Sequence, residues 1–389
     1  MSRKTVAVLT TSRADYALLR GTMRGIAHEP SLRLRVIACG SHLDRTRGFT
    51  VRAIARDGFA VAARVASTPD GDDAPAVAKA VGRAASGFAA AYARLKPDLL
   101  VVLGDRWELL AAASAAVAAG VPIAHLHGGE SSEGVIDEQV RHAITKLAHL
   151  HLPAAEPYRR RILQMGEEPR RVALAGAPGL ENLAELKAVP REALERLVGM
   201  SLREPFAVVT CHPETAGRVD LSIVGAVLGA IDALGLRAVV TLANADAGGA
   251  AINRRMLAWA RARRGRAAAV ASLGVEGYPS LVRLSSVVVG NSSSGIIEAP
   301  FLRVPTVNVG DRQKGRLRAT SVIDARATRP AVAAALRRAL SPSFRLRCRG
   351  ESPYRGGRVS ARVVAAIRRA LKDPRLAYKS FRDLPGRFD

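Results

Sequence analysis

Cysteine is scarce in this chain, which holds only three in 389 residues, at Cys39, Cys211 and Cys348. An odd number of widely spaced cysteines argues against a disulfide framework and against a zinc site built from thiolates. Long apolar runs are also missing, since none reaches the roughly 18–20 residues that a membrane span needs. The chain enters a strand within a few residues of its start, so we expect a cytoplasmic protein with no membrane partner.

Aromatic residues make up only 4% of the chain, whereas its formal net charge is +25, from 59 Lys+Arg against 34 Asp+Glu. Such a charge attracts nucleic acid, a membrane surface or a phosphorylated substrate. The arginines are scattered, and no stripe interleaves them with aromatic side chains that could stack on bases. We therefore expect no nucleic-acid partner and interpret the charge as diffuse attraction for a phosphorylated ligand.

The chain is long enough for two domains, and short apolar runs alternate with helical patterns along it. This alternation predicts an α/β fold: two doubly wound, Rossmann-like domains with mostly parallel sheets and a central cleft. Pro178–Pro205 has helical patterns and no convincing strand, which suits a hinge. We predict an N-terminal domain over residues 1–180, a C-terminal nucleotide-binding domain over 181–375 and a basic tail over 376–389.

Within this organisation, a helix is expected from about His42 to Asp57. The strands of the first domain are expected at Thr5–Thr10, Leu32–Cys39, Phe59–Val65, Asp98–Leu103, Val121–Leu126, His149–Pro153 and Val172–Ala175. Those of the second are expected at Phe206–Cys211, Arg237–Leu242, Ala268–Ser272, Val287–Gly290 and Thr306–Val309.

Polar residues directly follow two neighbouring apolar runs of the first domain. Asp105 and Arg106 come after one run, and His127 and Glu130 come after the next. In open α/β sheets, ligands bind outside the carboxyl ends of the strands, so these side chains should share one catalytic edge. A third polar group opens the following helix: Asp137, Glu138, Arg141 and His142.

Two turns resemble phosphate sites at helix N-termini, where free N–H groups and the helix dipole favour an anion. The first is S-R-A-D at 12–15, which could equally be an Asp15 cap beside an exposed Arg13. The second, N-S-S-S-G at 291–295, is stronger because a serine cap explains only one of its three hydroxyls. Glu298, on the first turns of the helix that follows, could bind a ribose diol or merely stabilise the helix dipole.

Histidines offer two further candidates. His212 follows a strand of the second domain and could bind phosphate, act as an acid or base, or be inert. His125, His127 and Glu130 could hold zinc, but alternate strand residues also suit a hydrogen-bonded active site. We favour the second interpretation and predict no tightly bound metal.

Six motifs, taken together and in order, resemble the hydrolysing UDP-N-acetylglucosamine 2-epimerases. They are S-R-A-D-Y (12–16), G-D-R (104–106), H-L-H-G-G-E (125–130), I-D-E-Q-V-R-H-A-I-T-K (136–146), C-H-P-E-T (211–215) and G-N-S-S-S-G-I-I-E (290–298). The resemblance implies a two-domain, glycosyltransferase-B-like fold. It also implies a UDP-sugar substrate and a place in pathways to sialic-acid-like sugars, including legionaminic acid.

The resemblance also implies a role for each matching residue. Arg13, Ser292 and Ser293 would hold the diphosphate, Glu298 the ribose and Arg312 the uracil, while His212 would face the pyrophosphate or the sugar. Asp15, Asn291 and Ser294 join the nucleotide-binding set. Asp105, Glu130 and Asp137 would be the acid/base carboxylates, with Arg106 and His127 close by.

The implied reaction removes the C2 proton while UDP leaves from C1, and then hydrates the glycal to the free 2-epimeric sugar. It needs no cofactor, and the chain has no dinucleotide fingerprint. A homo-oligomer, dimer or tetramer, is expected. A glycosyltransferase of the same fold and a catalytically dead UDP-sugar-binding protein remain alternatives.

Overall fold

The computed structural model describes residues 3–45, 49–71, 73–133, 135–214, 221–243, 248–271, 273–354 and 356–383. The chain divides into two compact units, each with its own six-stranded sheet. Unit 1 comprises Met1–Glu130, Asp137–Asn182 and Tyr354–Asp389. Unit 2 comprises Ser131–Ile136 and Leu183–Pro353. The predicted α/β class, with one parallel sheet in each half, is confirmed.

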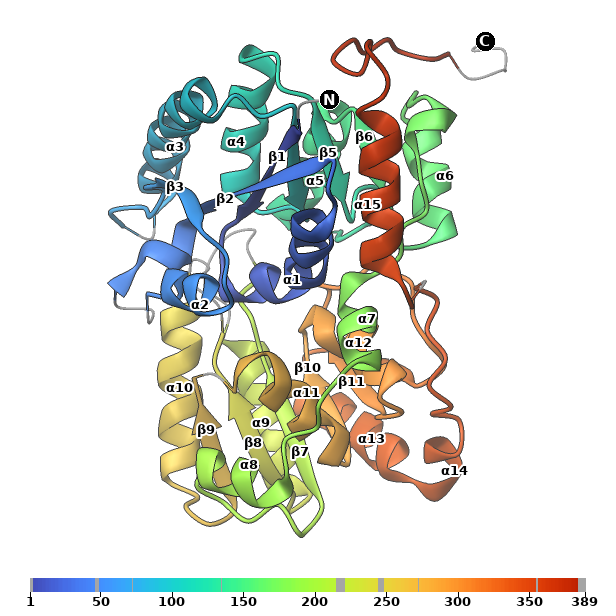
Figure 1. Cartoon of the computed structure of the whole chain (residues 1–389). Helices are drawn as coiled ribbons and strands as arrows, with labels where there is room; N and C mark the ends of the chain where they lie inside the picture. The colour runs from blue at the N-terminus through green and yellow to red at the C-terminus, as the bar shows by residue number, and fades with distance from the viewer. Residues whose placement is uncertain are drawn as a thin grey trace. The chain divides into compact units, whose positions relative to one another are not determined.

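The strands of unit 1 are all parallel and lie in the order β3-β2-β1-β4-β5-β6 (Figure 1). They are buried apolar runs, such as L-L-V-V-L in β4, as expected for a sheet covered on both faces. This order is that of a doubly wound nucleotide-binding sheet and reverses direction between β1 and β4. The strands are β1 (Lys4–Thr10), β2 (Leu32–Cys39), β3 (Val61–Val65), β4 (Leu99–Leu103), β5 (Ile123–Leu126) and β6 (Leu150–Leu152).

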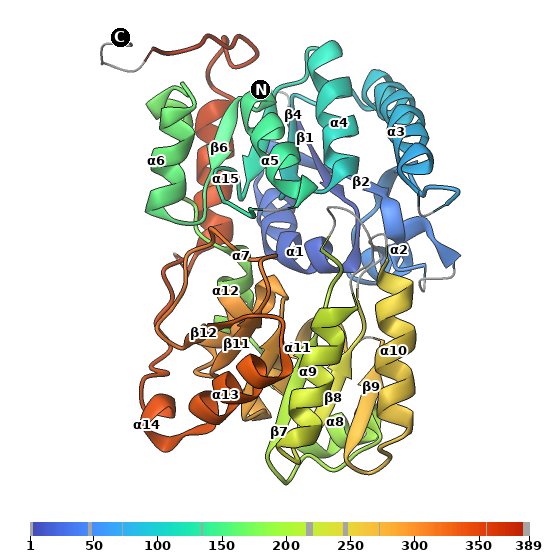
Figure 2. The same cartoon turned by 180° about the vertical axis from the view of Figure 1, so that it is seen from behind.

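Alternate strand residues of unit 1 point to two separate helix layers, because side chains alternate between the faces of a strand. Val8 packs with Leu19 of α1, whereas its neighbour Leu9 packs with Phe88 of α3. Helices α1, α2 and α15 cover one face and α3, α4 and α5 the other (Figures 1 and 2). The helices are α1 (Arg13–His28), α2 (Val51–Arg56), α3 (Ala74–Leu95), α4 (Trp107–Ala118), α5 (Ile136–Leu147), α6 (Glu156–Gln164), α7 (Pro178–Ala184) and α15 (Val359–Ala370), with 3-10 turns η1 (Gly40–Leu43) and η3 (Pro169–Arg171).

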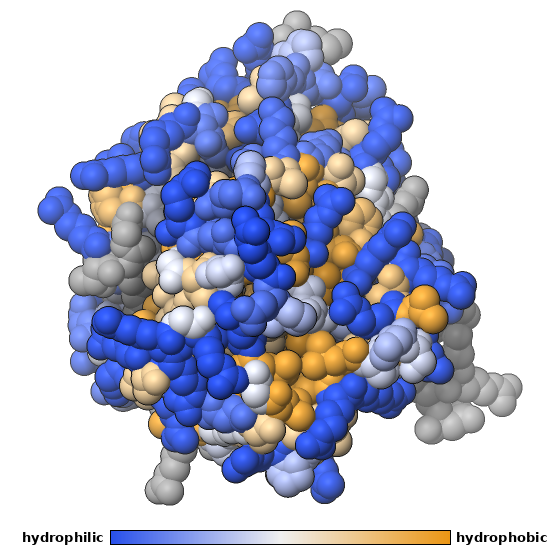
Figure 3. Space-filling model, turned by 90° about the horizontal axis from the view of Figure 1, so that it is seen from below, coloured by the Kyte–Doolittle hydropathy of each residue, from blue (hydrophilic) through white to orange (hydrophobic). Residues whose placement is uncertain are grey.

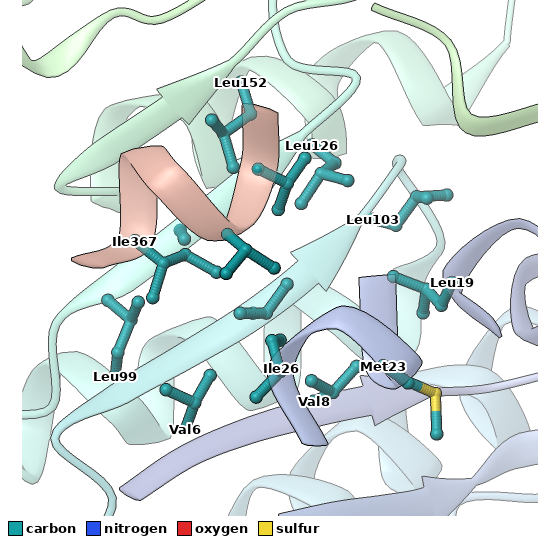
Figure 4. Close-up of a cluster of buried hydrophobic side chains, with 14 of the residues drawn as sticks. Val6, Val8, Leu19, Met23, Ile26, Leu99, Leu103, Leu126, Leu152 and Ile367 are labelled. Carbon is teal, nitrogen blue, oxygen red and sulfur yellow. The ribbon is translucent and has the colours of Figure 1, made fainter. Parts of the chain in front are cut away.

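Helix α15 belongs to unit 1, whereas the predicted boundary at residue 375 put it in the second domain. Its buried residues Val359, Val363 and Ile367 recur every four positions and form one apolar face. Figure 4 shows Ile367 over the sheet of unit 1, in the same cluster as Met23 of α1. Periodicity identifies such a face but not the core that it joins. The chain in fact leaves unit 1 after Asn182 and returns to it at Tyr354.

The predicted basic tail also packs on unit 1 over its described part, which ends at residue 383. Arg171 donates to the carbonyl oxygens of Leu376 and Tyr378, at 3.1 and 2.8 Å. Lys379 donates to the buried carboxylate of Glu167 at 2.6 Å. The described tail is therefore a docked segment of unit 1.

Unit 2 repeats the topology of unit 1. Its parallel strands lie in the order β12-β11-β10-β7-β8-β9, which reverses between β7 and β10. The strands are β7 (Phe206–Thr210), β8 (Arg237–Thr241), β9 (Ala267–Val270), β10 (Val287–Gly290), β11 (Thr306–Val309) and β12 (Val322–Ala325). The helices are α8 (Arg191–Val198), α9 (Ser222–Ala233), α10 (Gly249–Arg261), α11 (Gly274–Leu284), α12 (Ser293–Phe301), α13 (Arg329–Leu340) and α14 (Pro342–Arg345).

Three local predictions need correction. The expected helix over His42–Asp57 is instead η1 followed by α2, because buried His42 bonds the hydroxyls of Thr10 and Thr50, at 2.9 and 2.8 Å, and holds a turn. Residues 172–175 form no strand beyond one bridge between His151 and Val172, since Pro153 has no N–H to continue the ladder. The short edge strand β12 was missed. Ser272, the expected end of another strand, lies outside the described residues.

The exposed surface mixes polar and apolar residues. Figure 3 shows one face on which hydrophilic residues are spread, with apolar residues between them. Within the described ranges, no helix is long and apolar enough to cross a membrane. The large exposed apolar side chains come from different elements: Val117, Ile136, Leu197, Leu346, Tyr378 and Phe381.

The placement of α15 predicts the effect of truncating its buried face. Ile367→Ala should lower the free energy of unfolding by about 2–5 kcal/mol, because it leaves a cavity in the core of unit 1. Arg369→Ala, exposed on the same helix, should change it by less than about 0.5 kcal/mol. Urea denaturation followed by circular dichroism measures both. If both variants changed the free energy of unfolding by the same small amount, α15 would not complete the core of unit 1.

Candidate active site

Candidate residues follow the two strands at which the order of each sheet reverses, which is where open α/β sheets form a crevice. In unit 1, Arg13 follows β1 and Asp105 follows the neighbouring strand β4. In unit 2, His212 follows β7 and Asn291 follows the neighbouring strand β10. The sequence indicated these positions as strand ends, and the topology makes each pair adjacent.

Asp105 is held by Arg141, whose side chain is fully buried in α5. Arg141 Nε donates to Asp105 Oδ2 at 3.0 Å, and Nη2 donates to the same oxygen. Nη1 donates to the carbonyl oxygen of Glu130 at 3.1 Å and to Glu138 Oε2 at 2.8 Å. One guanidinium therefore joins the ends of β4 and β5 to α5, and its charge favours the ionised form of Asp105.

Arg106 faces a different carboxylate. Its Nε and Nη2 each donate to one oxygen of Glu108, both at 3.2 Å, in a bidentate pair. Glu108 is buried in the first turn of α4. Arg106 directly follows Asp105 in the sequence, but the guanidinium that we find on Asp105 is that of Arg141.

His127 and Glu130 form a dyad after β5. His127 Nδ1 lies 2.5 Å from Glu130 Oε1, and both side chains are buried. Because an ionised carboxylate can only accept, Nδ1 of a neutral ring carries the proton and Nε2 presents a lone pair. That buried Nε2 has no hydrogen-bond partner among the described residues. The dyad therefore offers a base whose orientation is already fixed.

The backbone at His127 is also unusual. Its φ of 63° lies in the left-handed region, which few residues other than glycine adopt. Such strain is often found at functional sites, where the surrounding structure holds it in place. At His127 it sets the direction from which the ring meets Glu130.

Asp137 is half-buried in the first turn of α5, where the helix dipole favours a carboxylate. Glu130 and Asp137 both belong to unit 1, whereas the segment between them, Ser131–Ile136, groups with unit 2. There the Glu133 N–H donates to the Lys314 carbonyl at 3.0 Å.

His125 is a structural residue of β5. Its Nε2 lies 2.7 Å from the carbonyl oxygen of Gly104, and its Nδ1 lies 3.3 Å from Thr145 Oγ1. Complete burial lowers the pKa of His125 to about 3, so the ring is neutral. With both nitrogens engaged, His125 cannot form the zinc site considered with His127 and Glu130.

Asp15 holds the turn after β1. Its carboxylate accepts from the backbone N–H groups of Thr11 and Ser12, both at 2.6 Å, and forms a capping box with Ser12. It therefore organises the turn, as in the alternative considered for this motif. Arg13, the first residue of α1, is exposed beside it.

The serines of unit 2 cap α12. Ser292 Oγ accepts from the Ser294 N–H at 3.3 Å, and Ser294 Oγ donates to Glu298 Oε2 at 2.7 Å. Burial raises the pKa of Glu298, and the Ser294 hydroxyl partly offsets this. Ser293 Oγ makes no hydrogen bond among the described residues. The helix N-terminus and the Ser293 hydroxyl thus remain available to an anion.

Asn291 ties together the strand ends of unit 2. It accepts from the His212 N–H at 2.7 Å and donates to the His212 carbonyl oxygen at 2.8 Å. Its own carbonyl oxygen accepts from Arg312 at 3.2 Å and from Gln313 at 2.9 Å. Gly290 lets the end of β10 lie close to the end of β7, because a Cβ at position 290 would be only 1.9 Å from the Thr210 carbonyl oxygen.

Glu108 and Gln313, which belong to these networks, were not predicted as functional. Arg141 was predicted only as a member of the polar group that opens the helix after β5, with no role or partner of its own. Its sequence signal is a lone arginine between Val140 and Ile144 of α5, which are apolar and buried. This spacing indicates that position 141 also turns partly towards the core.

Two doubly wound α/β units in one chain define the glycosyltransferase-B-like fold. A crystal structure of UDP-GlcNAc 2-epimerase from Neisseria meningitidis bound to UDP-GlcNAc shares it, with a TM-score of 0.80 and 14% identity over 94% of this chain and 100% of that one. The family model for UDP-N-acetylglucosamine 2-epimerase matches residues 24–368. The chain belongs to this family.

Two curated relatives are more similar in sequence. GDP/UDP-N,N'-diacetylbacillosamine 2-epimerase (hydrolyzing) of Campylobacter jejuni is 35% identical over 83% of this chain and 85% of its own length. UDP-N,N'-diacetylbacillosamine 2-epimerase (hydrolyzing) of Legionella pneumophila is 34% identical over 88% of this chain and 90% of its own. The predicted family resemblance is confirmed.

The pKa of His125 predicts a pH dependence of stability. The folded pKa of about 3 lies below the value near 6.5 of an unfolded histidine, so between them only the unfolded chain binds the proton. Stability should therefore fall as pH falls below about 6.5. His125→Asn should reduce the slope of unfolding free energy against pH by up to about 1.4 kcal/mol per unit. Urea denaturation from about pH 5 to pH 7 measures it.

The control for this experiment is His28→Asn, because His28 is exposed at the end of α1. That variant should keep the slope of the unmutated protein. A slope unchanged in His125→Asn would contradict the assignment of His125 as a buried neutral ring.

Proposed function

We propose that this protein is a hydrolysing 2-epimerase, which converts a UDP-2-acetamido sugar and water to UDP and the free 2-epimeric sugar. The observation that carries the proposal is the edge of unit 1. There the ion-paired carboxylate of Asp105 follows β4 and the His127–Glu130 dyad follows β5, with a buried His127 Nε2 that no described residue hydrogen-bonds. Family membership supplies the reaction class for which such acid/base groups are suited.

The chemistry needs two acid/base groups. In the first step the C2–H bond breaks, a C1=C2 double bond forms and the C1–O bond to UDP breaks. Water then adds its oxygen to C1, and a proton returns to C2 on the opposite face. One group must take the first proton and another must supply the second. Asp105 and the His127–Glu130 dyad are the proposed pair, with Asp137 as a third carboxylate.

The nucleotide is assigned to unit 2. The diphosphate is proposed to meet the N-terminus of α12 and the Ser293 hydroxyl, with Ser292 beside them. Glu298 is the proposed ribose ligand and Arg312 the uracil neighbour, while His212 lies at the adjoining strand end. Arg13 would place a positive charge beside the diphosphate as UDP departs, which lowers the barrier to breaking the C1–O bond.

The substrate is proposed to be the UDP-2,4-diacetamido-2,4,6-trideoxyhexose rather than UDP-N-acetylglucosamine. Both relatives with 34–35% identity carry diacetylbacillosamine in their names. The Neisseria meningitidis structure with bound UDP-GlcNAc is only 14% identical, so its likeness supports the fold alone. The two sugars differ at C4 and C6, and the reaction at C1 and C2 is the same for both.

Release of UDP from each sugar nucleotide, with no acceptor present, tests this function. The unmutated protein should release UDP from both and turn over the diacetamido substrate with the higher kcat/KM. Asp105→Asn should lower turnover at least about a hundredfold, because an amide cannot exchange the proton. Its thermal stabilisation by UDP should match that of the unmutated protein.

The outcomes separate the alternatives. UDP release only in the presence of an acceptor sugar would indicate a glycosyltransferase. Tight UDP binding without turnover of either substrate would indicate a binding protein. Normal turnover in Asp105→Asn would remove Asp105 from the mechanism.

A further inference from the structure

The Arg141 guanidinium is unusual because it is both fully buried and shared among three segments. Arginine is rarely buried unless it is paired. Here it donates to the carboxylates of Asp105 and Glu138 and to the carbonyl oxygen of Glu130. Asp105 follows β4, Glu138 lies in α5 and Glu130 follows β5. One planar guanidinium therefore connects the three segments of the candidate edge.

Burial of the Arg141 charge is expensive, which makes a purely stabilising role a poor explanation. Ion pairs removed from water often contribute little to stability compared with apolar residues of the same volume. An apolar residue at position 141 could fill the same space between Val140 and Ile144. What an apolar residue could not do is fix the orientation and ionisation of Asp105.

We propose that Arg141 is a positioning residue for the reaction, which holds Asp105 ionised and fixed in direction while it anchors the Glu130 peptide of the His127–Glu130 dyad. The two acid/base groups are thereby kept at a set separation by one planar group. This inference rests on the proposed function for its catalytic meaning, although the effect on Asp105 itself can be measured without turnover.

Within the described part of the chain, the other charged or titratable groups around Asp105 have partners of their own. His125, on β5, is neutral because burial lowers its pKa to about 3. Arg106, which follows β4, makes its bidentate pair with Glu108. Glu138, on α5, carries negative charge and accepts from both Arg141 and His142. Glu130 presents its carbonyl oxygen to Arg141 and its carboxylate to His127.

Lysine can replace the charge of Arg141 but not its geometry. A guanidinium presents five N–H donors in a fixed plane, whereas an ammonium is a single point charge on a flexible stem. Arg141→Lys should therefore keep Asp105 ionised yet lose the simultaneous hold on Asp105, Glu138 and the Glu130 carbonyl. Arg141→Met should lose both the charge that keeps Asp105 ionised and the hold on these three acceptors.

The test compares these two variants with Arg362→Met. Arg362 is a matched control because it is partly buried in unit 1 and donates to the carbonyl oxygens of Ala175 and Gly356, at 2.6 and 2.9 Å. We expect kcat to fall at least about a hundredfold in Arg141→Met and about tenfold in Arg141→Lys, with KM changed less than threefold in both. The acid limb of the profile of kcat against pH should move to higher pH in Arg141→Met but not in Arg141→Lys. Arg362→Met should lower the melting temperature and leave kcat and the profile unchanged.

A readout that needs no turnover separates this inference from the proposed function. The Asp105 carboxyl is titrated by NMR of 13C-labelled aspartate and assigned by its loss in Asp105→Asn. It should titrate at higher pH in Arg141→Met than in the unmutated protein, and at nearly the unmutated pH in Arg141→Lys. If Arg141→Met does not fold, Arg141→Lys still tests the geometry through its lower kcat.

Two results would overturn the inference. One is a folded Arg141→Met or Arg141→Lys variant whose kcat equals that of the unmutated protein. The other is an Asp105 carboxyl that titrates at the same pH in Arg141→Met as in the unmutated protein. If the unmutated protein turns over no UDP-sugar but Asp105 titrates as expected, the proposed function fails and the positioning of Asp105 stands.

Discussion

The guanidinium of Arg141 lies out of water against the carboxylates of Asp105 and Glu138, and this ion pair constrains everything else at the edge of unit 1. A buried guanidinium that lost both carboxylates would be an uncompensated charge, so the end of β4 and α5 must keep their placement relative to Arg141. Asp105 and the His127–Glu130 dyad take their positions from this constraint. The left-handed backbone of His127 lies at this same edge, and strained conformations of this kind cluster at functional sites.

The same architectural solution is used twice in one chain. In both sheets the strand order reverses between a first strand and its fourth, and candidate residues follow both of those strands. In unit 1 the His127–Glu130 dyad follows β5, one strand further along. Unit 1 supplies carboxylates and an imidazole, which suit proton transfer. Unit 2 supplies a helix N-terminus, hydroxyls and an amide, Asn291, that joins two strand ends, which suit a phosphate-bearing ligand. The proposed acid/base edge and the proposed nucleotide site thus both begin at the strand ends where the order of each sheet reverses.

Much of this could be predicted from the sequence, because buried parallel strands are continuous apolar runs and polar residues directly after them must lie at the carboxyl edge. Asp105, Glu130 and Asn291 were found in this way. The hydrogen-bond and ion-pair partners of these side chains could not be predicted, since they depend on which strands are neighbours and which side chains are buried. Arg141 rather than Arg106 holds Asp105, and Asp15 caps its own turn. The core that α15 joins was equally inaccessible, because its valines and isoleucine would suit either unit.

In the proposed reaction, C2 of the sugar loses its proton and later regains one from a protein acid. The most direct measurement is NMR of the sugar released when the unmutated protein turns over its UDP-sugar in deuterated water. An acid that exchanges with solvent should deliver deuterium, so the account predicts a 2-epimeric sugar with deuterium at C2. Released sugar that retains its original hydrogen at C2 would contradict elimination, and with it the assignment of Asp105 and the His127–Glu130 dyad as the acid/base pair.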